Sequence, residues 1–323
     1  MRNSTKIWLI AASSLVFLGI LIFVGVMMFF KWDFKKLSIR SYNTNTYETS
    51  EDFNSISINT NEADVIFIPS NDGQCKVVCY EREKMPHLIN VIDGTLNIEI
   101  DDTRRWYDHI GIFSFGHPMI TVYLPNAEYD SLTVKSSTGD VGIPKDFRFN
   151  NVDVSLSTGN VRFLSCSLGD VKLKTSTGSI SAENISVGSL DLSVTSGDIY
   201  ASNVTCEGDV NIRVSTGDAD LSEISCKNFT SYGNTGEIEL NGVIVAEKMS
   251  VERSTGDVEL YGCDASEIFI KTDTGDVEGT LLSDKIFITH TDTGRVKVPS
   301  TLLGGKCEIY TDTGNILFEI ESN

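Results

Sequence analysis

The sequence predicts an all-β protein: a parallel, right-handed β-solenoid of about ten coils of 19–20 residues, with an N-terminal β cap and one transmembrane helix before it. Two observations predict the solenoid. A Ser/Thr-Gly dipeptide returns at an almost constant spacing, and apolar residues alternate with polar ones around it. The helix is predicted by a long uncharged run near the N-terminus. Glycine is common (26) and proline scarce (6), a balance that favours β-structure when Ser, Thr, Val and Ile are abundant.

Residues 7–30 are the predicted transmembrane helix, after a short tail over residues 1–6. The run IWLIAASSLVFLGILIFVGVMMFF has no charged residue and would form roughly 36 Å of helix, enough to span a bilayer core of about 30 Å. Trp8 and Trp32 lie near its ends, where interfacial aromatic residues are expected. No small-residue cleavage site follows the run, so we expect an uncleaved signal anchor.

The orientation of this anchor has two opposing indications. Basic residues flank the span: Arg2 and Lys6 before it, and Lys31, Lys35, Lys36 and Arg40 after it. Counting these charges places the C-terminal side in the cytoplasm, but long domains translocate largely regardless of charge. We expect a single-pass protein of the cell membrane whose C-terminal domain is extracellular, joined to the helix by a juxtamembrane linker over residues 31–50.

Residues 51–131 depart from the repeat and are predicted to form a degenerate first coil and a β-hairpin cap. The stretch ISINTNEADVIFIP (56–69) has the form of LTVKSSTGDVGIP (132–144), with Asn-Glu-Ala-Asp in place of Ser-Thr-Gly-Asp. Asp93-Gly94 is a hairpin turn signal. We expect these strands to cover the open end of the solenoid, because an uncovered sheet edge promotes aggregation.

Residues 132–323 carry the repeat itself. The spacing between successive turn glycines is always 19 or 20 residues. The ten glycines are Gly139, Gly159, Gly178, Gly197, Gly217, Gly236, Gly256, Gly275, Gly294 and Gly314. Around each glycine the alternation of apolar and polar residues is typical of strands with one buried face.

Each copy therefore consists of a strand, a turn, a second strand and a short return. Two strands alone cannot bury their apolar face, but stacked copies can, with like residues about 4.8 Å apart. Parallel crossovers are nearly always right-handed. A series of antiparallel meanders is the alternative, although 19–20 residues allow only two strands in the same order each time. In the solenoid, glycine supplies the positive φ that a sharp corner requires.

The tripeptide Asp-Thr-Gly occurs at Asp273, Asp292 and Asp312 and resembles the catalytic loop of pepsin-like proteases. Such a protease needs two loops that face each other, so that two carboxylates share a proton. Here the three copies occupy the turn position held elsewhere by Ser-Thr-Gly, along one edge of a rod. The tripeptide is therefore interpreted as a turn, and no catalytic residue is predicted.

Two sets of side chains are candidate binding sites. Five successive coils place a carboxylate directly after the glycine: Asp198, Asp218, Glu237, Asp257 and Asp276. Stacked like charges are destabilising unless they are screened or bridged, so this ladder predicts either solvated turn acids or a calcium-bridged row. No cofactor is predicted apart from such a bridging calcium ion. Between two cap strands, Arg104, Arg105, Trp106 and Tyr107 form a loop that is either a binding surface or part of the cap.

The charge of the chain restricts its partners. The whole chain carries −19 and its first forty residues +5, which leaves −24 on residues 41–323. A domain this acidic is repelled by phosphate backbones, so no nucleic acid is expected as a partner. Cations and basic surfaces are the electrostatically favoured partners.

The seven cysteines predict neither a zinc knuckle nor a disulfide framework. Cys75 and Cys79 are four residues apart on a predicted strand, which is a poor spacing for a zinc pair. Cys166 and Cys263 fall in a column of apolar residues and are expected to be buried. Two others, Cys206 and Cys226, lie at the same place in neighbouring coils, either as a stacked pair of thiols or as a disulfide.

An N-terminal span, the strand TVYLPNAEYDSLTV (121–134) and serial STGDV-type repeats resemble the bacterial putative-adhesin family, a domain of unknown function. The resemblance covers about residues 50–320. It implies a membrane-anchored or secreted β-helix of bacteria, and it implies no catalytic residue.

These features predict a non-enzymatic, adhesin-like interaction or scaffold protein of the cell surface, with a cell-wall polymer, a host glycan or an envelope protein as partner. A solenoid offers such partners an extended surface. One alternative is an intracellular membrane-tethered scaffold. Another is a β-helix enzyme acting on polysaccharides, although the coils are too short and uniform for the irregular loops that such an enzyme needs.

Overall fold

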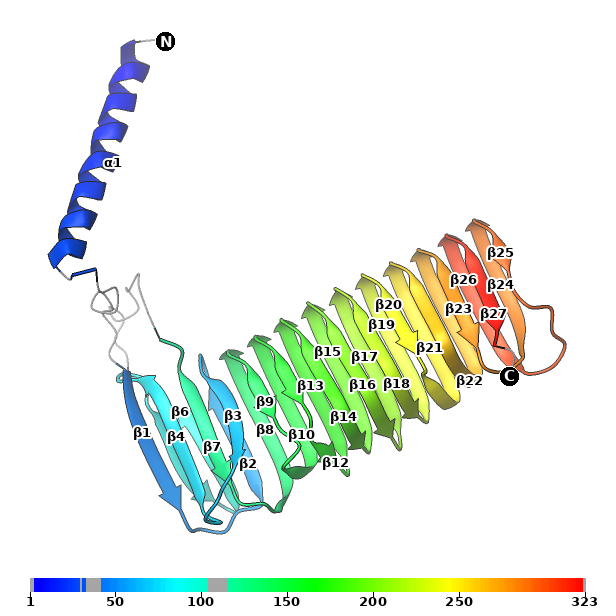
Figure 1. Ribbon diagram of the computed structural model, residues 1–323, viewed down its shortest axis with the longest axis horizontal. Helices are drawn as coiled ribbons and strands as arrows, with labels where there is room; N and C mark the ends of the chain where they lie inside the picture. Colours follow the sequence, from blue (N-terminus) through cyan, green and yellow to red (C-terminus); the bar gives the residue numbers. More distant parts are fainter. Residues whose placement is uncertain (1–2, 30, 33–41, 104–115, 322–323) are drawn as a thin grey trace.

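The computed structural model describes residues 3–29, 31–32, 42–103 and 116–321, which form one helix and 27 strands (Figure 1). Helix α1 spans Asn3–Phe29, and its apolar span Trp8–Phe29 has a mean hydropathy of 2.7. No part of the most apolar 18-residue window is buried against protein, although Met27 near the end of the helix is buried. This helix is long and apolar enough to cross a bilayer. An apolar helix that leaves almost all of its apolar side chains exposed is typical of a membrane anchor or a signal sequence.

The strands build a β-solenoid whose coils lie side by side along a rod (Figure 1). Each coil contributes a long strand before its turn glycine: β8 Glu128–Thr138, β10 Arg148–Thr158, β13 Asp170–Thr177, β15 Ser189–Ser196, β17 Asp209–Thr216, β19 Asn228–Thr235, β21 Ile244–Thr255, β22 Val258–Thr274, β24 Lys285–Thr293 and β26 Gly305–Thr313. The strands after the glycines are β9 Val141–Ile143, β11 Val161–Phe163, β12 Cys166–Ser167, β14 Ile180–Val187, β16 Ile199–Cys206, β18 Ala219–Cys226, β20 Ile238–Asn241, β23 Val277–Leu281, β25 Val296–Lys297 and β27 Ile316–Ile320. Strand β22 runs through one whole coil into the next.

Parallel pairing at a constant offset confirms the predicted solenoid. Val154 pairs with Leu173, nineteen residues on, and Leu192 pairs with Ile212, twenty residues on. Both side chains of such a pair point inward. The core is therefore a set of columns of Val, Ile, Leu and Phe along the rod. Each inward side chain packs on its counterparts in the two neighbouring coils. The apolar surface of one coil is therefore buried by the coils on either side of it.

The cap closes the N-terminal end with a change from parallel to antiparallel pairing. Its strands are β1 Tyr42–Thr49, β2 Ser55–Thr60, β3 Asp64–Pro69, β4 Cys75–Arg82, β5 His87–Ile92, β6 Thr95–Ile100 and β7 Met119–Leu124. Strands β2 and β3 stack on β8 and β9 in parallel, in the position of a further coil. Beyond them β6 and β7 add in parallel, and then β5, β4 and β1 pair antiparallel. The linker predicted over residues 31–50 therefore ends in strand β1, which belongs to the cap sheet.

The last two coils are stacked in the reverse of their sequence order, which the repeat does not predict. Strand β26 pairs with β22 on one side and with β24 on the other. The C-terminal coil is thus inserted between the coils of Gly275 and Gly294, and the coil of Gly294 ends the rod (Figure 1). Gly304 and Gly305 allow this insertion, since a Cβ at either would overlap a backbone oxygen, that of Asp284 or Ser266.

Candidate functional site

Along the turn edge of the rod, backbone hydrogen bonds join each coil to the next. Nine of the ten turn glycines have φ between 123° and 155°, and Gly294 in the terminal coil is the exception. A Cβ on Gly217 would overlap the carbonyl oxygen of Gly197 in the preceding coil, and the same close approach recurs along the column. Glycine is needed here both for its backbone conformation and for this proximity.

The four aspartates of the ladder lie along this edge and accept backbone hydrogen bonds from the next coil. Asp198 Oδ1 accepts the N–H of Asp218 at 3.0 Å, and Asp218 Oδ1 accepts that of Glu237 at 2.8 Å. Farther along, Asp276 Oδ1 accepts the N–H of Asn315 at 2.7 Å. Because the C-terminal coil is inserted there, Asn315 follows Asp276 on this edge and Arg295 follows Asn315. These bonds give Asp198, Asp218 and Asp276 structural partners without a metal ion.

We expect Asp218→Asn to leave the stability of the rod unchanged within about 0.5 kcal/mol, and Asp218→Ala to lower it by about 1 kcal/mol. An asparagine Oδ1 can keep the bond, as Asn160 Oδ1 does with the N–H of Ser179 at 2.9 Å, whereas alanine cannot. Urea unfolding of the full-length protein in detergent micelles measures both changes.

The calcium hypothesis predicts in addition that a chelator lowers the unfolding midpoint and that added Ca²⁺ raises it. A midpoint unaffected by both would contradict that hypothesis.

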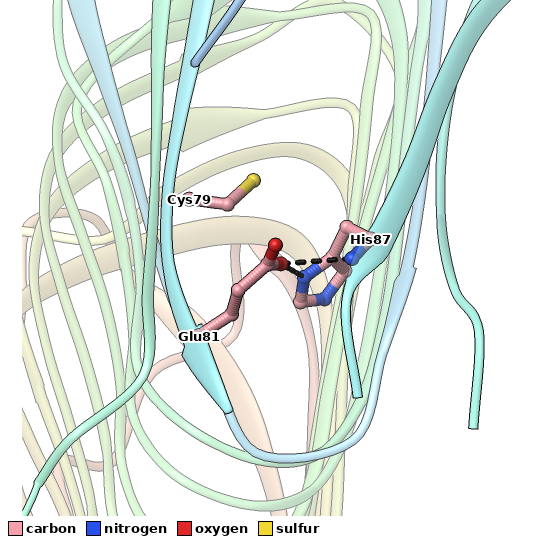
Figure 2. A group of neighbouring side chains, drawn as sticks. All are labelled: Cys79, Glu81 and His87. Carbon is pink, nitrogen blue, oxygen red and sulfur yellow. Dashed lines mark hydrogen bonds and ion pairs between the residues drawn. The ribbon is translucent and has the colours of Figure 1, made fainter. Parts of the chain in front are cut away.

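A second cluster lies inside the cap, where Cys79 and Glu81 of β4 face His87 of β5 (Figure 2). On β4 the inward positions alternate, so residues 79 and 81 share the buried face, and each residue is only 1% exposed. The turn after β4 brings the imidazole back onto the carboxylate. One ligand atom from each of the three side chains lies within 4.8 Å of the other two.

The carboxylate of Glu81 is held by three hydrogen bonds. His87 donates to Oε2 from Nδ1 at 2.5 Å and from its backbone N–H at 2.8 Å. Asn45, on the edge strand β1, donates from Nδ2 to Oε1 at 2.6 Å. On the far side of the imidazole, Thr60 Oγ1 lies 2.9 Å from Nε2. The cluster therefore ties β1, β2, β4 and β5 together around one buried charge.

The Cys79 thiol is not an activated nucleophile. Burial, and then the negative charge of Glu81, raise its pKa to about 12. A thiol with this pKa is protonated at neutral pH, and the thiolate is the nucleophilic form. The protonated thiol therefore suits hydrogen bonding, or metal ligation once an ion displaces its proton, and it does not suit covalent catalysis.

The structure places the other predicted residues as follows. Cys263 is buried as expected, but Cys166 is exposed, which corrects the expectation that it packs in the core. Its neighbours Ser165 and Ser167 are buried in its stead, and their hydroxyls donate to the backbone oxygens of Phe147 and Asn150. All seven cysteines are free thiols. That includes the stacked pair at positions 206 and 226.

The binding loop predicted from the sequence lies outside the described residues. It comprises Arg104, Arg105, Trp106 and Tyr107. The cap cluster, in contrast, was not predicted, although strand alternation alone would have placed Cys79 and Glu81 on one face. What the sequence did not reveal is the pairing that brings His87 to them.

The fold and the apolar helix define a class of protein: a β-solenoid with one N-terminal segment able to enter a membrane. Within this class, the chain belongs to the Toastrack DUF4097 family, whose model matches residues 53–213 and 207–323. None of the curated proteins compared matches the chain.

Several solved structures resemble the chain at low sequence identity. A putative adhesin from Bacteroides fragilis NCTC 9343 is 16% identical, with a TM-score of 0.34, over 86% of this chain and 97% of that one. A putative adhesin from Parabacteroides distasonis ATCC 8503 is 11% identical, with a TM-score of 0.44, over 87% and 98%. A putative lipid binding protein from the same organism is 14% identical, with a TM-score of 0.39, over 86% and 97%. These values are too low to transfer any binding property to this chain.

Proposed function

We propose that this protein is a membrane-anchored, non-enzymatic β-solenoid of the cell surface that serves as an interaction or scaffold protein. The observation that carries the proposal is the pairing of helix α1, whose most apolar 18-residue window is not buried in the chain, with a continuous rod of stacked coils. Such a rod offers a partner a long repetitive surface in place of a pocket. A cell-wall polymer, a host glycan or an envelope protein is the class of partner that suits it.

An intracellular membrane-tethered scaffold is the second candidate, and one observation favours it. More basic residues follow the apolar run than precede it, and Lys31, Lys35 and Lys36 lie directly on its C-terminal side. Positive charge close to a span is retained in the cytoplasm, so these residues would hold the rod inside the cell.

The exposed thiol of Cys166 allows the two locations to be distinguished. The other six cysteines are buried, so a membrane-impermeant maleimide should label the native protein at Cys166 alone. With the rod outside, intact cells that express the full-length chain are labelled, and Cys166→Ser removes the signal. The control is a cytoplasmic protein with an exposed cysteine, which must stay unlabelled. Labelling that occurs only after lysis would contradict the surface location and support the intracellular scaffold.

A further inference from the structure

We propose that Cys79, Glu81 and His87 form a binding site for a divalent transition-metal ion of the zinc class. The three side chains supply a thiolate, a carboxylate and an imidazole, the ligand types that Zn²⁺ takes in proteins. Their ligand atoms already lie within 4.8 Å of one another in the buried interior of the cap (Figure 2). This site is separate from the acidic ladder and independent of the proposed function of the rod.

The ligand atoms need only a small rearrangement to receive an ion. Zn²⁺ binds sulfur at about 2.3 Å and nitrogen or oxygen at about 2.0–2.2 Å, so the ligand atoms of a tetrahedral site are separated by roughly 3.3–3.8 Å. His87 Nδ1 and Glu81 Oε2 are 2.5 Å apart, and the ion would take the place of the hydrogen bond between them. A water molecule would complete the four ligands, as in sites with three protein ligands.

The surrounding residues match the partners that metal ligands require. A histidine that ligates through one ring nitrogen usually donates a hydrogen bond from the other. With the ion on Nδ1, the ring proton moves to Nε2 and is donated to Thr60 Oγ1, which lies 2.9 Å away. Asn45 Nδ2, at 2.6 Å from Glu81 Oε1, holds the oxygen of the carboxylate that does not bind the ion.

The ion would also neutralise a charge that the fold buries. Glu81 is 1% exposed, and its carboxylate depends on the hydrogen bonds from His87 and Asn45, because burying a charge is costly. Binding requires the thiolate of Cys79, so the bound ion displaces the thiol proton, and affinity rises with pH. The site would join β4 and β5 directly and hold the edge strand β1 through Asn45.

The test uses cobalt(II) and zinc(II) alone as probes on the full-length protein in detergent micelles, reduced and freed of metal. A Cys166→Ser background removes the exposed thiol. We expect one equivalent of Co²⁺ to bind with a thiolate-to-cobalt charge-transfer band and with d–d absorption of tetrahedral strength. Zn²⁺ should displace it. These spectra come from the unaltered cluster, so they do not depend on the folding of a variant.

Variants then assign the ligands. Cys79→Ser and His87→Gln should each weaken Zn²⁺ binding at least about 100-fold, and Thr60→Val about 10-fold. The matched control is Cys75→Ser, which alters a buried cysteine on the same face of β4 outside the cluster and should bind Zn²⁺ like the parent. The proposal is overturned if no charge-transfer band develops, or if Cys79→Ser binds as tightly as Cys75→Ser. In that case the pair of Glu81 and His87 has a structural role only.

Discussion

Gly217→Ala is expected to lower the free energy of unfolding by about 3–4 kcal/mol. Gly217 has φ 128°, a backbone conformation that residues with a Cβ rarely adopt. The added Cβ would also overlap the carbonyl oxygen of Gly197, which belongs to the coil beneath. That overlap can be relieved only if the two coils separate, and this would weaken the hydrogen bond from the N–H of Gly197 to Thr216 O at 3.0 Å.

Urea unfolding of the full-length protein in micelles measures this loss. Amide hydrogen exchange should locate it at the neighbouring coils, because a coil contacts only its neighbours. Gly142→Ala is the matched control: Gly142 lies in β9 without a positive φ, and a Cβ there meets nothing within 4 Å. Its stability should stay within about 0.5 kcal/mol of the parent. Equal midpoints for the two variants would show that the turn column does not depend on glycine.

The solenoid could be predicted because its determinants are local and repeated. Every coil presents the same turn glycine and the same inward apolar columns, so a constant spacing in sequence becomes a constant stacking in space. The order of the last two coils could not be predicted in this way. Gly294 and Gly314 are equivalent in the repeat, and their order depends on the return through Gly304 and Gly305, where two backbones come close together.

The two candidate sites differ in the same way: the acidic ladder could be predicted from the repeat, and the cap cluster could not. The row of acids after the turn glycines follows from the period alone, and the structure places Asp198 and Asp218 next to each other on this edge. The cap cluster depends on contacts between strands that do not repeat: β4 with β1, and the turn from β4 into β5. A cysteine, a glutamate and a histidine within nine residues are too common a combination to indicate a site without that geometry.

A buried arginine is the second feature with a large expected effect. Arg253 is 5% exposed and lies between Gly233 and Thr272 of the flanking coils. Its guanidinium donates to Ser231 Oγ at 3.0 Å and to Glu252 O at 3.1 Å, and among the described residues no carboxylate forms an ion pair with it. Gly233 leaves room for it, since a Cβ there would lie 2.7 Å from its Nη1. A buried charge that forms no ion pair costs stability, and the negative charge of Asp218 offsets only part of that cost.

Arg253→Met is therefore expected to stabilise the rod by about 1–3 kcal/mol, because methionine fills much of the same space without a charge. Burial lowers the pKa of Arg253 to about 10, below the 12.5 of a solvated arginine. The folded state thus disfavours the proton, and the penalty is fully present at any pH below about 10. The gain in the urea midpoint should be the same at pH 6 and pH 8.

Arg213→Met provides the control for this gain. Arg213 occupies the same kind of strand two coils away, but its side chain is 55% exposed and pairs with Asp191 at 3.0 Å. Exposed ion pairs contribute about 0–1 kcal/mol, so this variant should be unchanged or slightly less stable. If Arg253→Met lowered the midpoint while Arg213→Met did not, the hydrogen bonds to Ser231 and Glu252 would outweigh the cost of the buried charge. The arginine would then be a net stabilising element of the core.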